Sequence, residues 1–126
     1  MQQTAHTKRS FFRSFRHAIR GLTEIWKHQQ NARLILIIAI GVIASGIILQ
    51  ISYIEMVMVL LTIGLVFVAE IFNSMVEETI DLFLQVELER IRIIKDMAAG
   101  AVWVSCVIAS VVGYFVFIRR LLALLF

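Results

Sequence analysis

Residues 53–84 read YIEMVMVLLTIGLVFVAEIFNSMVEETIDLFL, and this stretch decides the fold. Its first part, Met56–Ala69, carries no charge, but 14 residues are too few to cross a membrane as a helix. The helical pattern nevertheless continues through polar residues to Phe83, with no proline and with no glycine after Gly64. The sequence therefore predicts one long membrane helix over 53–84 whose second half is polar on one side.

Two further apolar runs lie on either side of this stretch. Leu34–Ile54 holds 21 uncharged residues, enough at ~1.5 Å per residue to cross a hydrocarbon core of about 30 Å. Polar residues interrupt the apolar run at 50–53, which is the best place for a turn. Met97–Ile118 holds 22 uncharged residues and is closed by two arginines. We therefore predict membrane helices over 34–51 and 96–118.

The composition supports a membrane protein. The chain of 126 residues is 60% hydrophobic, has no proline, and has a mean hydropathy of +0.90. A soluble domain of this size cannot bury so much apolar surface, which excludes an ordinary soluble enzyme, a disordered tail and a collagen-like fibre. The chain has a single cysteine, which excludes an internal disulfide. It has no cluster of Cys and His residues, which excludes a structural zinc site.

Residues 1–33 carry seven basic side chains against one acidic side chain. Within 10–30, apolar residues recur at spacings of three and four, which predicts a basic amphipathic helix that lies in the membrane interface. The apolar body indicates that this positive charge binds anionic lipid headgroups rather than nucleic acid. The fold class is thus an all-α membrane protein, a single domain over 1–126 with an N-terminal amphipathic surface helix plus three transmembrane helices.

The lysines and arginines also predict an orientation. The N-terminal arm and the segment holding Arg90, Arg92 and Lys95 should both be cytoplasmic, which puts the C-terminus outside.

The polar half of 53–84 forms one stripe. Asn73, Ser74, Glu77 and Asp81 all lie within about 60° of Glu70 around a helix. Glu70 is roughly 26 Å along the helix from Tyr53, near the cytoplasmic edge of the hydrocarbon, where an ionisable group is costly and normally functional. A carboxylate there suits a general base.

A lysine and an aspartate, Lys95 and Asp96, start the last span at the same interface, followed by the small residues 98–101 that permit close helix contact. Carboxylates facing a lysine at a polar–apolar boundary indicate a divalent cation with a phosphate, since Mg²⁺ is bound by one or two carboxylates plus substrate phosphates. The chain has neither GxxxxGK[ST] nor GxGxxG, so spacing alone does not indicate a nucleotide site.

The pattern Glu70-x-x-Asn73-Ser74-x-x-Glu77-x-x-x-Asp81, followed by Lys95-Asp96-Met and a small-residue run, resembles the bacterial integral-membrane diacylglycerol kinase and undecaprenol kinase family. The resemblance covers most of the chain. It implies a trimeric bundle in the bacterial cytoplasmic (inner) membrane, a homotrimer with active sites between subunits. It also implies transfer of the ATP γ-phosphate to a lipid hydroxyl at the cytoplasmic interface, with Mg²⁺.

The resemblance also implies roles for individual residues. Glu70 would be the general base and, with Ala99, would contact the lipid substrate. The metal and phosphates would be held by Asn73 and Glu77. The nucleotide and its phosphates would be bound by Lys95, Asp96, Arg9 and Arg13.

The sequence departs from the family pattern at three places. The residue after Arg33-Leu34, often acidic or histidine in the family, is Ile35. Gln29 stands where a metal-binding glutamate is usual, and an amide oxygen is a weaker ligand. The 82–94 segment also differs, with Glu87 or Glu89 as a substitute for its usual acidic residue. The alternative function is therefore a catalytically weakened or inactive family-like protein that binds lipid or a partner. A small multidrug-type transporter fits less well, because such proteins normally have four spans and no basic surface helix.

Overall fold

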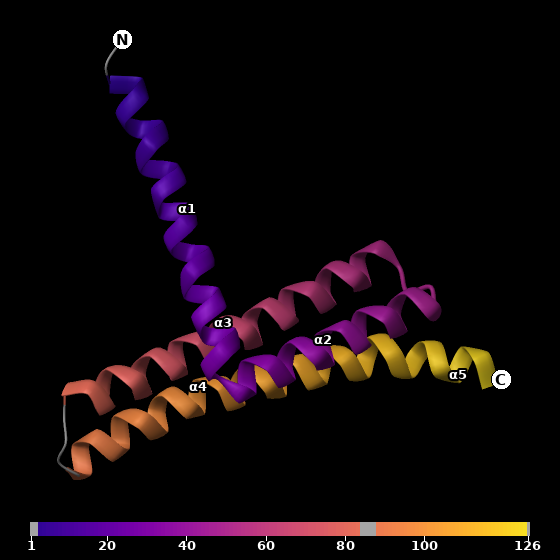
Figure 1. Ribbon diagram of the computed structural model, residues 1–126. Coiled ribbons are helices and arrows are strands. Elements are labelled where there is room, and N and C mark those ends of the chain that lie inside the picture. Colours follow the sequence, from indigo (N-terminus) through magenta and orange to yellow (C-terminus); the bar gives the residue numbers. More distant parts are fainter. Residues whose placement is uncertain (1–2, 84–87, 126) are drawn as a thin grey trace. The chain divides into compact units, whose positions relative to one another are not determined.

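The computed structural model describes residues 3–83 and 88–125, with the side chains of 11–83 and 88–122, and the described residues contain no strand. Its elements are α1 (Gln3–His28), α2 (Gln30–Ile48), α3 (Tyr53–Phe83), α4 (Glu89–Gly113), a π-helical turn (Tyr114–Ile118) and α5 (Arg119–Leu125) (Figure 1). Three stretches of this part are long and apolar enough to cross a membrane: Gln30–Ile48, Tyr53–Phe83 and Glu89–Leu122. The predicted all-α class with three spans is confirmed.

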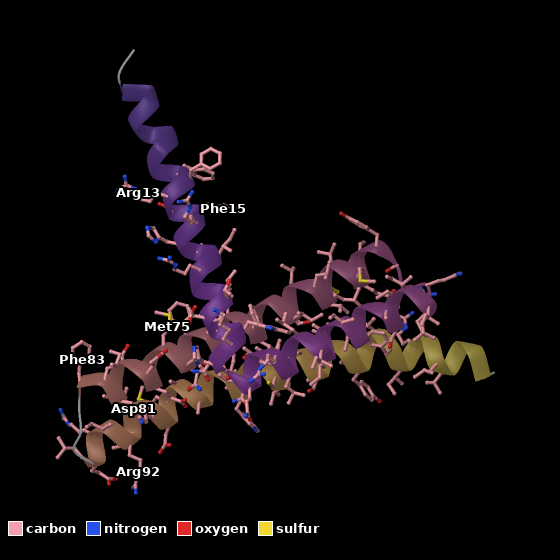
Figure 2. The ribbon with its side chains drawn as sticks, in the orientation of Figure 1. Arg13, Phe15, Met75, Asp81, Phe83 and Arg92 are labelled. Carbon is pink, nitrogen blue, oxygen red and sulfur yellow. The ribbon has the colours of Figure 1, made fainter. Side chains whose placement is uncertain are left out.

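The chain divides into two compact units, 1–30 and 31–126, and the single membrane domain expected from the sequence stays a prediction. In the first unit, α1 exposes an apolar stripe that includes Phe15, Leu22 and Trp26, while Arg13 lies elsewhere on the same helix (Figure 2). The helix begins at Gln3 rather than near residue 10, because no helix-breaking residue precedes the apolar stripe.

The end of α2 is set by backbone hydrogen bonds rather than by the end of the apolar run, so the helix covers 30–48 instead of 34–51. Ile51 N–H donates to Gly46 O over 3.1 Å, and Gln50 N–H donates to Ile47 O over 3.1 Å. Gln50 has a φ of 50°, so this is a Schellman motif with a glutamine in the left-handed position. A Cβ at Gly46 would lie 2.9 Å from Ile51 Cδ1, so a larger residue there would require the end of the Ile51 side chain to shift.

A capping box starts α3 directly after this turn. Glu55 N–H donates to Ser52 Oγ over 3.3 Å, and Ser52 N–H donates to Glu55 Oε2 over 2.7 Å. Two backbone donors that lack helical partners are satisfied in this way. The four residues 49–52 therefore hold α2 and α3 as an antiparallel pair of helices.

The same glutamate joins α3 to the C-terminal end of the chain. Arg120 Nη2 lies 3.4 Å from Glu55 Oε2, so an arginine at the end of the last span has an acidic partner there. The last span begins at Glu89 rather than at residue 96, because two helical turns of mainly polar residues precede the uncharged run. In the first of these turns, Arg92 Nη2 donates to Glu89 Oε1 over 2.9 Å.

Packing in the second unit centres on α3 and α4, which lie antiparallel with their backbones close together (Figure 1). The buried residues Val59, Val66 and Asn73 of α3 repeat at seven, a spacing that keeps one face toward a neighbouring helix. Ser105 of α4 is also buried, and its small side chain permits close approach. The backbone of α2 lies farther from this pair.

The capping box makes a stability prediction. Ser52→Ala should lower the free energy of unfolding by about 1 kcal/mol, because the Glu55 N–H loses its acceptor at the start of α3. Denaturant unfolding in detergent micelles, followed by helical circular dichroism, measures the change. Ser45→Ala is the matched control, because its hydroxyl only bonds to Gly41 O within α2. Equal midpoints for the two variants would show that the box does not stabilise the helix.

Candidate active site

Three polar side chains are buried on one face of α3. Glu70, Asn73 and Ser74 are only 3%, 7% and 4% exposed, although they lie in a helix that otherwise buries only valines. Their spacing of three and four residues places them on adjacent turns of one face. The acidic stripe predicted from the sequence is therefore turned toward protein at Glu70 and Asn73, while Glu77 is half-buried and Glu78 is exposed.

The amide of Asn73 is half satisfied. Its Nδ2 donates to Glu77 Oε1 over 3.2 Å, which fixes the amide so that Oδ1 is its free acceptor. That Oδ1 is buried and has no hydrogen-bond partner. An unsatisfied buried acceptor costs about 1–3 kcal/mol, so this oxygen is suited to a donor or a cation that arrives with a ligand.

A second interaction brings α4 to the stripe. Lys95 Nζ donates to Asp81 Oδ1 over 2.6 Å, from the second turn of α4 to the last turns of α3. Figure 2 shows Asp81 between α3 and α4, near the C-terminal end of α3. Met75 points away from α4. Lys95 thus lies at the polar end of the stripe, and the neighbouring Asp96 and Ala99 are exposed on α4.

Arg33 is a candidate that the sequence reasoning did not select. Its Nε is buried and has no hydrogen-bond partner. Ile35 of α2 and Val66 of α3 line one cavity, and the helices run antiparallel, so Arg33 and Glu70 both lie beyond that cavity toward the same end. The signal in the sequence is a lone arginine directly before an uncharged span.

For the other residues predicted from the sequence, no contact with the stripe is seen among the described residues. Gln29 lies between α1 and α2, where its N–H donates to Ile25 O over 2.8 Å, and Arg13 is exposed on α1. The side chain of Arg9 and the whole of Glu87 lie outside the described residues. Glu89 is paired with Arg92 in the first turn of α4.

The residues of the stripe fit a magnesium ion, although the described part of the chain holds no group of three His, Cys, Asp or Glu side chains that could bind a metal. Mg²⁺ takes oxygen ligands and is commonly held by one or two carboxylates together with substrate phosphates. The carboxylate of Glu77 and the unpartnered Oδ1 of Asn73 supply this kind of donor set. A complete cage of protein ligands is therefore not required.

Comparison with known proteins identifies the family of the chain. Residues 16–117 match the model of the prokaryotic diacylglycerol kinase family. The chain is 35% identical over 111 residues to an undecaprenol kinase from Bacillus subtilis, a match that covers 88% of this chain and 90% of the relative. It is 33% identical over 113 residues to a diacylglycerol kinase from Synechocystis, covering 89% of this chain and 65% of that relative. The chain therefore belongs to the prokaryotic diacylglycerol kinase family.

Proposed function

We propose that this lipid kinase transfers the γ-phosphate of ATP to the hydroxyl group of a membrane lipid, with Glu70 as the general base. The observation that carries the proposal is the burial of a carboxylate, 3% exposed, inside an apolar membrane span. Such a group is expensive in hydrocarbon and is normally kept for function. The relatives named above are an undecaprenol kinase and a diacylglycerol kinase, and each of those lipids has one free hydroxyl.

The proposed step is a single displacement at phosphorus. Glu70 accepts the proton of the lipid hydroxyl while the hydroxyl oxygen forms a bond to the γ-phosphorus. The bond between that phosphorus and the β–γ bridging oxygen breaks, and its electron pair leaves with ADP. The products are a lipid phosphate, ADP and a protonated Glu70, which returns its proton to solvent before the next turnover.

The other side chains bind and orient the phosphates. Asn73 and Glu77 would hold Mg²⁺, which when bound supplies positive charge to the transferring phosphoryl group. Lys95, held by Asp81, would contact phosphate oxygens, and Asp96 would bind the nucleotide. Arg9 and Arg13 of α1 would contact phosphate, and Ala99 of α4 would line the lipid site.

We also propose that the sites form between subunits of a homotrimer in the bacterial inner membrane, with the N-terminus in the cytoplasm and the C-terminus outside. At most 17% of the residues in any of the three apolar windows are buried within one chain, which leaves wide faces for other copies or for lipid. The cytoplasmic side supplies ATP, and the basic residues of 1–33 and of 90–95 favour the same side.

The role of Glu70 can be tested directly. Glu70→Gln should lower kcat by about 10²–10⁴-fold, because an amide cannot accept the hydroxyl proton. The measurement is transfer of label from γ-labelled ATP to lipid in proteoliposomes with Mg²⁺. Glu78→Gln is the matched control, since Glu78 is an exposed carboxylate on the same helix and should keep its rate within about twofold. A Glu70→Gln protein of normal rate would remove Glu70 as the base.

The pairing of Lys95 with Asp81 leads to a second prediction. Asp81→Asn should raise the KM for ATP by about two- to fivefold with little change in kcat, because the lysine loses its fixed position but keeps its charge. The size follows from the ~0.2–1 kcal/mol that a partly exposed ion pair contributes. Initial rates over a range of ATP concentrations separate the two constants. A fall in kcat at unchanged KM would instead give Asp81 a part in the chemical step.

Gln29 provides a test of metal affinity. Gln29→Glu should shift the Mg²⁺ dependence of the rate to lower concentrations, because a carboxylate binds this cation more strongly than an amide oxygen. The neighbouring Gln30→Glu adds the same charge at an exposed position and serves as the control. If the two variants behave alike, the effect is general electrostatics and Gln29 is not a ligand.

A further inference from the structure

Arg33, in the first turn of α2, is a cation to which the described residues give no partner. Its Nε is buried and makes no hydrogen bond. The ion pairs among the described residues join other basic side chains to other carboxylates. A charged group at the start of an apolar span is costly unless it is paired, so we expect its partner to be an anion that binds from outside the chain.

The register of α2 against α3 gives the level of Arg33 in the bundle. A Cβ at Gly46 would lie 3.0 Å from Met56 Cε, so these residues are adjacent across the antiparallel helices. Ala32 comes fourteen residues before Gly46, and Glu70 comes fourteen residues after Met56, which brings Ala32 and Glu70 to about the same level. Ala32 is 1% exposed, so α2 is packed against protein there. Arg33 is the next residue, and helical side chains lean toward the N-terminus of their own helix, which here is toward the polar end of the stripe.

The other described cations of the second unit lie away from this level. They are in the first two turns of α4 or in α5. Lys95 is the member of the first group closest to Glu70, and its partner Asp81 is about 16 Å along α3 from Glu70. Arg120 of α5 pairs with Glu55, which is roughly 22 Å from Glu70 in the opposite direction. The described cation of this unit that is level with Glu70 is therefore the arginine at the start of α2.

The position of Glu70 determines which phosphate group meets this arginine. In the reaction proposed above, Glu70 takes the proton of the lipid hydroxyl, and the oxygen of that hydroxyl bonds to the γ-phosphorus. The γ-phosphate therefore lies level with Glu70 during transfer, whereas Lys95 is suited to phosphates farther toward the polar end. Negative charge is spread over the non-bridging oxygens of the transferring group, and the planar N–H groups of a guanidinium match such oxygens.

We propose that Arg33 is a further catalytic residue, whose guanidinium donates hydrogen bonds to a non-bridging oxygen of the γ-phosphate during transfer. The proposal rests on the lipid-kinase function proposed above and adds a residue to its site. It also explains why two polar atoms stay buried and unsatisfied in the chain alone. The phosphate oxygen is the acceptor for Arg33 Nε, and a cation carried with the phosphates supplies the partner of Asn73 Oδ1.

The first experiment separates binding of ATP from transfer. Arg33→Gln should lower kcat by about 10²–10³-fold, as the loss of one donor to a transition state does, while the KM for ATP stays within about twofold. Arg33→Lys should fall between this variant and the unsubstituted protein, because it keeps the charge and loses the planar fork. Label transfer from γ-labelled ATP to lipid in proteoliposomes with Mg²⁺ measures both constants. Arg119→Gln is the matched control, an exposed arginine at the opposite end of the chain that should keep its rate within about twofold.

The outcomes of this experiment are distinct. A normal kcat for Arg33→Gln, or a raised KM for ATP at unchanged kcat, overturns the proposed role of Arg33 and leaves the lipid-kinase function intact. If the unsubstituted protein transfers no label to either a polyprenol or a diacylglycerol, the lipid-kinase function itself is overturned.

The second experiment tests whether Arg33 acts on the transferring group or only supports the fold. Isothermal titration calorimetry with the protein in detergent and Mg²⁺ compares binding of ADP alone with binding of ADP and aluminium fluoride, which imitates the phosphoryl group in transfer. Arg33→Gln should bind ADP as the unsubstituted protein does, but should lose at least about tenfold of the additional affinity that aluminium fluoride gives, because transition-state analogues depend on the interactions made during transfer. Loss of ADP binding, or an unchanged effect of aluminium fluoride, contradicts a contact with the transferring phosphate.

Discussion

A carboxylate inside hydrocarbon must be covered by protein or by a ligand, and the second unit of this protein is arranged around that constraint. Glu70 is buried with Asn73 and Ser74 on a single face of α3, the helix that packs closely against α4. Burial leaves two polar atoms unsatisfied, because Asn73 Oδ1 and Arg33 Nε are buried without hydrogen-bond partners. Unused acceptors and donors of this kind are costly unless a substrate completes them, which connects the burial of the stripe with its chemistry.

Two ion pairs join α3 to the last span, one from α4 and one from α5. Lys95 and Asp81 meet near the polar end, and Arg120 and Glu55 meet at the opposite end. Partly exposed ion pairs contribute little free energy, so the close packing of α3 against α4 is the larger contribution to holding these helices together. The backbone of α2 lies farther from the α3–α4 pair, and the cavity between the three helices is lined by Val66, one helical turn before Glu70.

Much of this arrangement was predictable, because helical periodicity is a local property. The uncharged runs predict three spans, and the spacing of polar residues after Ala69 predicts a single stripe. The helix ends were less predictable. The apolar run suggested that the first span reaches residue 51, whereas a Schellman motif at Gln50 ends α2 at Ile48. The Ser52-x-x-Glu55 capping box could have been recognised from its spacing, since that signal lies within four residues.

The sequence by itself determined that the chain has three helices long and apolar enough to cross a membrane and an ionisable group within the second of them, because hydropathy and helical spacing require only neighbouring residues. Tertiary structure decided which charges meet. Asp81 and Lys95 are separated by 14 positions, and Glu55 and Arg120 by 65, so their pairing depends on how the helices pack. The cavity that Val66 lines, one helical turn before Glu70, also depends on tertiary structure. Its size is set by the distance between the helices, which the sequence of a single helix does not determine.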